Sequence, residues 1–299
     1  HFDINAIPKR QFIQKLCEMC PNALEKSRLE YFLGSEEGES DLIQYTIREK
    51  RSILLVFRDF PSIRPSLSQL IQIMPRIRPR AFSIASSNRT SSENVELCVS
   101  VVKYSAILNT IRHGLCSNYL SHLYAGSIVP GWIDRGSIEF PNLEKLKEKV
   151  SLVLICTGTG IAPMRAFLNE LEMSFAKKSV EIYMYFGCRH EKDGDFLYEN
   201  ELKKYVSRGM IKLLRVAFSR DQIEHEKKIY VQDLLEEDKD IMKPILLDGK
   251  TQIYITGSSG AMPRQVQNTL EFIAFGTNAS QSDENALHAF QKRIHTECW

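Results

Sequence analysis

The chain has 299 residues, which is enough for two domains of ordinary size, each with its own hydrophobic core. A formal net charge of +2 gives no reason to expect a nucleic-acid partner, and 43% hydrophobic residues is typical of a soluble protein. No apolar run reaches the roughly 20 residues that span a bilayer, so we expect no membrane segment in this chain.

The seven cysteines are scattered, which favours reduced thiols and a cytoplasmic location over a disulfide framework. Cys17 and Cys20 form one C-x-x-C pair. Because a zinc site needs a second pair of ligands, we expect no metal and a structural role for these two thiols. The chain begins with His1 rather than methionine, so we expect it to be part of a longer protein.

The first part of the chain is predicted to be a small helical unit. Helical patterns cover Phe2 to Phe32, with a break at Pro21, then Leu42 to Phe57 and Leu67 to Met74. The acidic stretch from Gly34 to Asp41 is expected to be a loop.

The next part alternates as antiparallel strands do. Phe82 to Ala85 and Val95 to Tyr104 are strand-like, with a polar loop over Ser86 to Asn94 between them. Gly114 to Leu123 is predicted to be helical, and Ser127 to Phe140 to supply further strand-like pieces. The pattern indicates a barrel or sandwich domain, which ends in a charged connector over 141–149.

Strands and helices alternate in the second half of the chain. Strands are expected at Leu152 to Ile155, Val180 to Phe186, Ile211 to Phe218 and Gln252 to Thr256. Helices are expected at Met164 to Phe175 and Leu197 to Val206, near Val231 and near Met262. A polar loop over 278–284 and a last helix or strand over 286–294 complete the chain. Such alternation predicts a parallel sheet with helices on both faces and a ligand at the carboxyl ends of its strands.

A glycine turn, Gly158-Thr159-Gly160, separates the first of these strands from the helix that follows it. Free amides and the positive end of the helix dipole suit an anionic pyrophosphate, although such a turn can also be purely structural. Pro163 stands where the usual dinucleotide fingerprint has a third glycine or alanine, and no Gly-Lys-Ser/Thr of a P-loop follows. The turn therefore indicates a different class of nucleotide-binding protein.

Four motifs come in the order and spacing of the ferredoxin-reductase-like NADPH modules of diflavin reductases. They are Gly158-Thr159-Gly160-Ile161-Ala162-Pro163, Phe186-Gly187-Cys188-Arg189, Ser219-Arg220 and Tyr230-Val231-Gln232. Upstream, Arg80-Ala81-Phe82-Ser83 resembles the Arg-x-Tyr-Ser motif for FAD in that family, and Gly114-Leu115-Cys116-Ser117 resembles its second flavin motif. The resemblance covers essentially the whole chain. It implies an α+β and α/β fold, in which an antiparallel flavin-binding β-barrel with a helical insertion (1–149) precedes a parallel-sheet α/β NADPH-binding domain (150–299).

The resemblance implies FAD and NADPH as cofactors, with FMN in a preceding domain. Matching positions for FAD are Arg51, Arg80, Ala81, Phe82, Ser83, Cys98, Val99, Ser100, Tyr104, Gly114, Leu115, Cys116, Ser117 and Trp299. Matching positions for NADPH are Thr159, Ser219, Arg220, Lys228, Tyr230 and Gln232. Cations such as Arg220 and Lys228 favour a ribose phosphate over a free hydroxyl, although both could simply be solvated. Glu181 lies about twenty residues after the turn, as the acid of an NAD fold does, but we discount it because it begins a strand.

Three residues match catalytic positions of the family: Ser83, Glu297 and Trp299. The resemblance implies that Trp299 stacks on the flavin ring and moves aside for nicotinamide, and that Glu297 handles protons or nicotinamide charge. A disordered tail is the alternative for Trp299. The chain departs from the family at Thr256, where a cysteine is usual, and at Phe82, which replaces the tyrosine of Arg-x-Tyr-Ser.

Arg-Ala-Phe-Ser, Met262-Pro263 and the terminal Glu-x-Trp are most similar to the NADPH-dependent diflavin oxidoreductase branch. The resemblance implies electron transfer through an FMN domain to an anamorsin-type carrier in cytosolic iron–sulfur cluster assembly. A reductase for haem mono-oxygenases or for methionine synthase is the alternative within the family. A non-enzymatic scaffold that keeps the fold is the alternative from another class.

Overall fold

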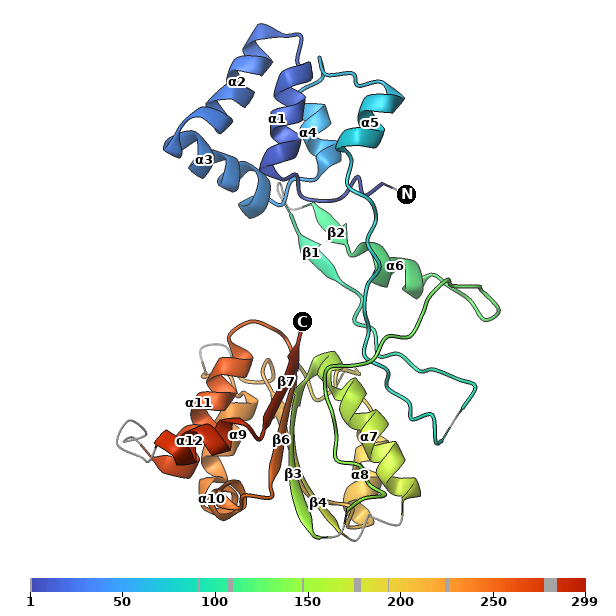
Figure 1. Ribbon diagram of the computed structural model, residues 1–299, viewed down its shortest axis with the longest axis vertical. Helices are drawn as coiled ribbons and strands as arrows, with labels where there is room; N and C mark the ends of the chain where they lie inside the picture. The colour runs from blue at the N-terminus through green and yellow to red at the C-terminus, as the bar shows by residue number, and fades with distance from the viewer. Residues whose placement is uncertain are drawn as a thin grey trace. The chain divides into compact units, whose positions relative to one another are not determined.

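In the computed structural model, the residues described are 2–90, 92–106, 110–146, 148–174, 179–192, 194–223, 226–276 and 284–299. They form two compact units (Figure 1). The first unit consists of the chain up to Ala81 together with Val101–Val129, and the second of Phe82–Ser100 together with Pro130–Trp299.

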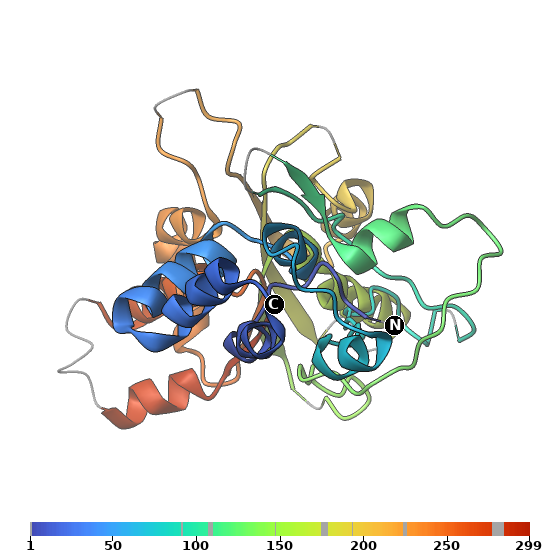
Figure 2. The same cartoon turned by 90° about the horizontal axis from the view of Figure 1, so that it is seen from above.

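The first unit is built mainly from short helices around one apolar core. They are α1 (Arg10–Met19), α2 (Ala23–Gly34), α3 (Glu36–Ile43), the π-helical η1 (Gln44–Arg48), α4 (Ile53–Asp59) and α5 (Leu67–Ile73). Helices α2 and α3, drawn in blue, are neighbours (Figure 2). Ile13, Leu16, Leu29 and Val56 are fully buried in the core. The predicted helical unit is therefore confirmed.

The loop predicted over Gly34 to Asp41 is wrong, because α3 begins at Glu36. Ser35 caps this helix with its side chain, which accepts a hydrogen bond from the amide of Gly38 at 2.9 Å. Gly38 also packs against α2 so closely that a Cβ would lie 1.9 Å from the carbonyl oxygen of Tyr31. The glycine that suggested a loop therefore serves a helix contact.

The described antiparallel structure consists of a small sheet and two isolated bridges. Strands β1 (Lys103–Ser105) and β2 (Ile111–His113) pair in the first unit, which also holds α6 (Leu115–Ser121). One bridge joins Phe2 and Arg76 in the first unit, and the other joins Ile84 and Leu97 in the second unit.

The strand-like pieces expected over Ser127 to Phe140 are wrong, because no strand forms in this described stretch. In the second unit, Phe140 instead stacks on Phe167 and Tyr254, with ring centroids 4.4 and 4.6 Å away. The packing of the Phe140 ring, rather than hydrogen bonds between strands, therefore fixes the end of this segment.

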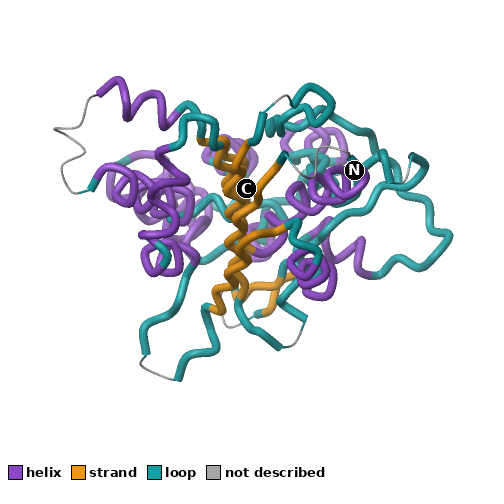
Figure 3. Tube along the Cα trace, turned by 90° about the horizontal axis from the view of Figure 1, so that it is seen from below, coloured by secondary structure: helices purple, strands orange, loops and turns teal. Residues whose placement is uncertain are grey.

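The second unit contains a five-stranded parallel sheet within its described residues. Its strands are β3 (Val150–Thr157), β4 (Val180–Cys188), β5 (Ile211–Phe218), β6 (Gln252–Gly257) and β7 (Ile294–Cys298). Their order is β5-β4-β3-β6-β7, which makes β3 the central strand. Figure 3 shows the strands in orange as a twisted stack.

Helices cover both faces of this sheet, as predicted (Figure 1). One face packs against α7 (Ile161–Met173) and α8 (Glu199–Ser207), the other against α9 (Val231–Glu237), α10 (Lys239–Leu247), α11 (Met262–Phe275) and α12 (Glu284–Gln291). Successive side chains of β3 alternate between the two cores, with Leu154 in the first and Val153 in the second. This two-sided burial explains why the strand is continuously aliphatic.

Two further expectations concern the end of the chain. The polar loop expected over 278–284 falls outside the described residues except for Glu284, which begins α12. The last element expected over 286–294 corresponds to α12, which is followed by β7. In the part of the chain that the structure describes, no helix is long and apolar enough to cross a membrane.

Candidate functional site

The glycine turn lies at the carboxyl end of the central strand and is packed tightly against the next strand. A Cβ on Gly160 would lie 2.6 Å from the carbonyl oxygen of Thr256, at the end of β6. The buried hydroxyl of Thr256 donates a hydrogen bond to the carbonyl oxygen of Gly160 at 2.6 Å. Thr256, noted in the sequence only as a departure from the family, therefore anchors the turn.

Gly158 provides the open side of the same turn. Its φ of +52° lies in the left-handed region that favours glycine, and no atom lies within 4 Å of the position of a Cβ. Thr159 is partly buried beside it, and α7 begins at Ile161. An open backbone turn at the start of a long helix fits a pyrophosphate group.

A carboxylate between two serines lies at the same edge of the sheet. Glu297, on β7, pairs in register with Thr256 on β6. Its Oε1 accepts a hydrogen bond from Ser83 Oγ at 3.1 Å, and its Oε2 accepts one from Ser137 Oγ. The structure thus brings together two of the three predicted catalytic residues, Ser83 and Glu297.

Trp299 is held by its backbone next to this carboxylate. Its amide donates to the carbonyl oxygen of Gly257 at 2.9 Å, and its carbonyl accepts from the amide of Ser259 at 3.0 Å. The side chain is 50% exposed. A fixed backbone with a half-exposed indole is unlike a disordered tail and suits a ring that covers a ligand.

The loops after β4 and β5 are joined to each other at the same edge. Ser219 and Arg220 donate their amides to the carbonyls of Cys188 and Arg189, at 3.0 and 2.8 Å. His190 Nδ1 lies 2.7 Å from Asp221 Oδ1. The amide of Glu191, and then His190, hold the pKa of Asp221 below its usual value.

Lys228 and Tyr230, which were predicted to contact the ribose phosphate and adenine, are exposed before α9. Gln232 donates through Nε2 to Gln265 Oε1 at 3.2 Å, while its own Oε1 is buried without a hydrogen-bond partner. A buried oxygen that lacks a hydrogen-bond donor is suited to accept a hydrogen bond from the amino group of a bound base. The residues present therefore suit an adenine nucleotide.

Several predicted flavin residues lie in the first unit. The amide of Val102 donates to Ser117 Oγ at 3.0 Å, and a Cβ on Gly114 would lie 2.7 Å from that oxygen. Ser117 therefore packs the start of α6, with Leu115 exposed and Cys116 partly buried beside it. Tyr104 on β1 lies under the ammonium group of Lys50, 4.7 Å from the ring centroid.

The two arginines predicted for FAD in this unit differ in their surroundings. Arg80 is exposed, like Ala81, and donates to the carbonyl of Arg78, two residues earlier. Arg51 pairs with Glu49 and Asp59, and its guanidinium lies 4.4 Å from the ring centroid of Tyr45. An exposed cation such as Arg80 is available to a phosphate, whereas Arg51 already has two carboxylate partners.

The remaining flavin candidates, Phe82, Cys98, Val99 and Ser100, belong to the second unit with Ser83. Phe82, Cys98 and Val99 are partly buried and Ser100 is exposed. Burial raises the pKa of the Cys98 thiol, so this cysteine is a poor nucleophile at neutral pH.

Cys17 and Cys20 are both buried in the helical core of the first unit. Across the described ranges, no group of three or more His, Cys, Asp or Glu side chains could hold a metal ion.

Sequence reasoning missed Ser137 and Arg165. Ser137 gave no signal, because a serine in an irregular segment is common and its partner is 160 residues away. Arg165 follows the glycine turn by five residues, and its position on the first turns of α7 could have drawn attention to it.

Comparison with known proteins identifies two cofactor-binding domains in the chain. A model of the FAD binding domain matches residues 1–119, and a model of the oxidoreductase NAD-binding domain matches residues 154–268. The chain is 36% identical over 313 residues to NADPH-dependent diflavin oxidoreductase 1 of Mus musculus, which covers 100% of this chain and 50% of that protein. The protein of the same name from Dictyostelium discoideum is 35% identical over 280 residues, or 90% of this chain and 43% of that protein.

A more distant relative is the NADPH–cytochrome P450 reductase of Musca domestica, which is 29% identical over 310 residues, or 100% of this chain and 45% of that protein. The chain thus spans about half the length of the relatives it matches.

Proposed function

Since this chain belongs to the diflavin reductase family, as its two cofactor-binding domains and its relatives show, we propose that it binds FAD and NADPH and catalyses the reduction of FAD by NADPH. The observation that carries the proposal is the meeting of Glu297, Ser83 and the backbone of Trp299 at the sheet edge that also bears the glycine turn. The bound cofactors supply the hydride chemistry, and the chain supplies position and charge.

Each group of residues has a separate part in this proposal. The turn around Thr159 holds the pyrophosphate of NADPH, and Ser219, Arg220 and Lys228 hold its ribose phosphate. Trp299 covers the flavin and excludes water until nicotinamide takes its place. Glu297, oriented by two serine hydroxyls, places a negative charge where positive charge develops on nicotinamide.

We place the FAD-binding domain at residues 1–149 and the NADPH-binding domain at 150–299. Arg80, with Ala81, and the Gly114 to Ser117 turn are assigned to FAD in the first unit, together with Tyr104 and Arg51. Phe82, Ser83, Cys98, Val99 and Ser100 are assigned to FAD in the second unit. FAD bound to the purified chain would support this assignment, and its loss in the Arg80→Ala variant would locate the site.

The decisive test of function is an anaerobic titration of the FAD-loaded chain with NADPH. We expect the flavin absorbance to be bleached by one equivalent of NADPH, because one hydride reduces one FAD. With ferricyanide present, turnover should follow without any further protein. A chain that takes up no FAD, or whose flavin stays oxidised in excess NADPH, would overturn the proposal and favour the non-enzymatic scaffold.

Preference for NADPH should depend on two exposed cations. The double variant Arg220→Ala, Lys228→Ala is expected to lower kcat/KM for NADPH by roughly 100-fold or more, because each charge-assisted contact contributes about 1.5 to 3 kcal/mol. The value for NADH should change little. Steady-state rates with both nucleotides give the ratio of kcat/KM for NADPH to kcat/KM for NADH.

Lys227→Ala is the matched control, because this neighbouring lysine is already paired with Asp233 at 2.6 Å. An unchanged NADPH to NADH ratio in the double variant would show that the ribose phosphate is held elsewhere.

We further propose that a longer parent protein passes these electrons through an FMN domain to an anamorsin-type carrier in cytosolic iron–sulfur assembly, with the cytoplasm as its location. The higher identity to diflavin oxidoreductases than to the cytochrome P450 reductase supports this branch. With the full-length parent, electron delivery to an anamorsin-type protein should exceed delivery to a haem mono-oxygenase or to methionine synthase. Faster reduction of either alternative acceptor would reassign the branch.

A further inference from the structure

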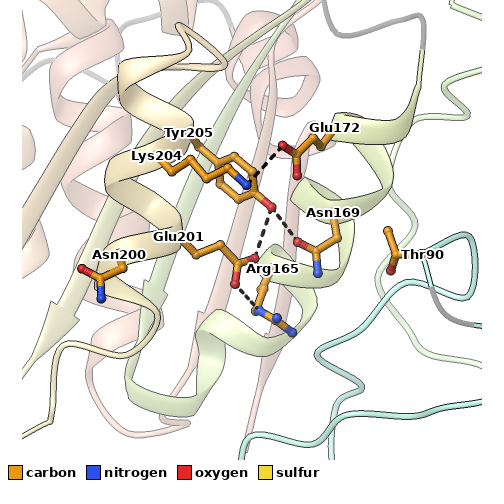
Figure 4. Close-up of a pocket in the computed structure, with 8 residues that line it drawn as sticks. All are labelled: Thr90, Arg165, Asn169, Glu172, Asn200, Glu201, Lys204 and Tyr205. Atoms are coloured by element: carbon orange, nitrogen blue, oxygen red, sulfur yellow. Dashed lines mark hydrogen bonds and ion pairs between the residues drawn. The ribbon is translucent and has the colours of Figure 1, made fainter.

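Arg165 is a charged side chain with several partners on the helix that follows the glycine turn. It extends from α7, the helix that begins directly after the turn, and its side chain is only 14% exposed. Its Nε donates to Glu201 Oε2 on α8 at 2.9 Å. Figure 4 shows this pair in a surface depression between the two helices, with Asn169 and Tyr205 bonded to each other beside it.

The other end of the guanidinium reaches a different part of the chain. Nη1 donates to the carbonyl oxygen of Ala85 at 2.8 Å and to Glu96 Oε2 at 2.5 Å. Ala85 and Glu96 are themselves paired, because the amide of Ala85 donates to the carbonyl of Glu96 at 2.8 Å. Arg165 therefore binds both arms of the antiparallel pair that surrounds the Ile84 to Leu97 bridge.

Tyr198 completes the contact from the side of α8. Its ring centroid lies 4.5 Å from the Arg165 guanidinium carbon, and its side chain packs, like that of Cys98, against the core on the α7 and α8 face of the sheet. Its φ of +56° is a left-handed conformation that is costly for a residue with a side chain. Because such strain persists only where surrounding contacts outweigh it, the Arg165 contact and the packing of the ring against the core compensate for this backbone conformation.

These contacts act on the segment that carries Ser83. Ser83 precedes Ala85 by two residues and donates to Glu297, and Cys98 follows Glu96 by two residues. The segment is thus held at Ser83 by Glu297, and at both Ala85 and Glu96 by Arg165. All of these residues belong to the second unit.

We propose that Arg165 is a positioning residue that fixes the flavin-side segment Phe82–Ser100, and with it Ser83, relative to the glycine turn at the start of its own helix. The proposal rests on the proposed function. In that reaction a hydride passes from the nicotinamide, which is oxidised to NADP⁺, to FAD, which is reduced. A shift of about 1 Å between the groups that align donor and acceptor can cost as much as 100-fold in rate.

The test compares Arg165→Met with Arg165→Lys and with Arg208→Met. Arg165→Met keeps the aliphatic stem but removes all three polar contacts. In Arg165→Lys, the single ammonium group of lysine can keep only some of these contacts. Arg208 is the matched control, because it pairs with Glu172 on the same helix α7 and is exposed. Glu96→Gln, which changes only an exposed carboxylate, serves as a milder variant if Arg165→Met does not fold.

The first readout needs no cofactor. Hydrogen exchange of the Ala85 and Glu96 amides, which donate to Glu96 O and Ser86 Oγ, reports whether the segment is held. We expect about tenfold faster exchange in Arg165→Met than in Arg208→Met, with a smaller increase in Arg165→Lys and in Glu96→Gln.

The second readout is the kinetics of flavin reduction by NADPH in the FAD-loaded chain. We expect kcat to fall about tenfold in Arg165→Met with KM for NADPH unchanged, and Arg165→Lys to recover part of the loss. Wild-type exchange and wild-type kcat in Arg165→Met would overturn the positioning role. A raised KM with unchanged kcat would overturn it too, since Arg165 would then act on nucleotide binding. Failure of the wild-type chain to reduce FAD would instead count against the proposed function.

Discussion

Replacement of Glu297 by glutamine is expected to slow the reduction of bound FAD by NADPH about 100-fold, the scale of losing one pre-organised electrostatic group. Glutamine keeps the shape of the side chain and can still accept a hydrogen bond from Ser83, but it has no negative charge. The charge is what stabilises a nicotinamide that becomes positive during hydride transfer. Stopped-flow flavin absorbance at saturating NADPH measures the rate.

Two further variants make this result specific. Glu148→Gln removes an exposed carboxylate that pairs with Lys250, and it should leave the rate unchanged. Ser137→Ala should cause a smaller loss than Glu297→Gln, because it frees one carboxylate oxygen and leaves the other on Ser83. A Glu297→Gln chain that reduces its flavin at the wild-type rate would remove the carboxylate from the mechanism.

The second large effect concerns stability. Gly160→Ala is expected to destabilise the second unit by about 3 kcal/mol, the upper part of the range for overpacking a buried site. The new Cβ would lie 2.6 to 2.8 Å from Thr256 and Gly257 backbone atoms, which cannot move without disturbing the end of β6. The midpoint of thermal unfolding should then fall by about 6 to 12 °C, and NADPH binding should weaken as the turn is displaced.

Gly249→Ala is the matched control, because this glycine has an ordinary φ and nothing within 4 Å of its Cβ position. Its unfolding midpoint should be that of the wild type or slightly higher, since alanine has less entropy to lose on folding. A Gly160→Ala chain as stable as Gly249→Ala would mean that the turn and β6 can separate at little cost.

The parallel sheet was predictable because its strands are read from local pattern. A continuous aliphatic run such as that of β3 requires burial on both faces, and only a sheet between two helical layers provides it. The region from Gly34 to Asp41 was not predictable in the same way. Its acidic residues and glycines are typical of loops, and only the Ser35 cap and the close approach of Gly38 to Tyr31 make a helix of it.

The candidate site likewise contains residues that local motifs predict and contacts that they do not predict. Arg80, the glycine turn, Ser219 and Trp299 stand in short motifs, and the resemblance of these motifs to those of diflavin reductases implies their ligands. The bond from Ser83 to Glu297 joins residues 214 positions apart, so no local pattern contains it. Ser137 carries no motif at all, and its part in orienting the carboxylate depends entirely on where the chain folds back.

The sequence by itself determined the cofactor-binding motifs and the alternating strands and helices, because both depend on residues that are close along the chain. The tertiary structure alone decided that Thr256 anchors the glycine turn, that Ser137 shares Glu297 with Ser83, and that Arg165 holds both arms of the flavin-side segment. These are contacts between side chains and backbone groups far apart in sequence. Their formation depends on the register of β3, β6 and β7 and on the packing of α7, which no single segment specifies.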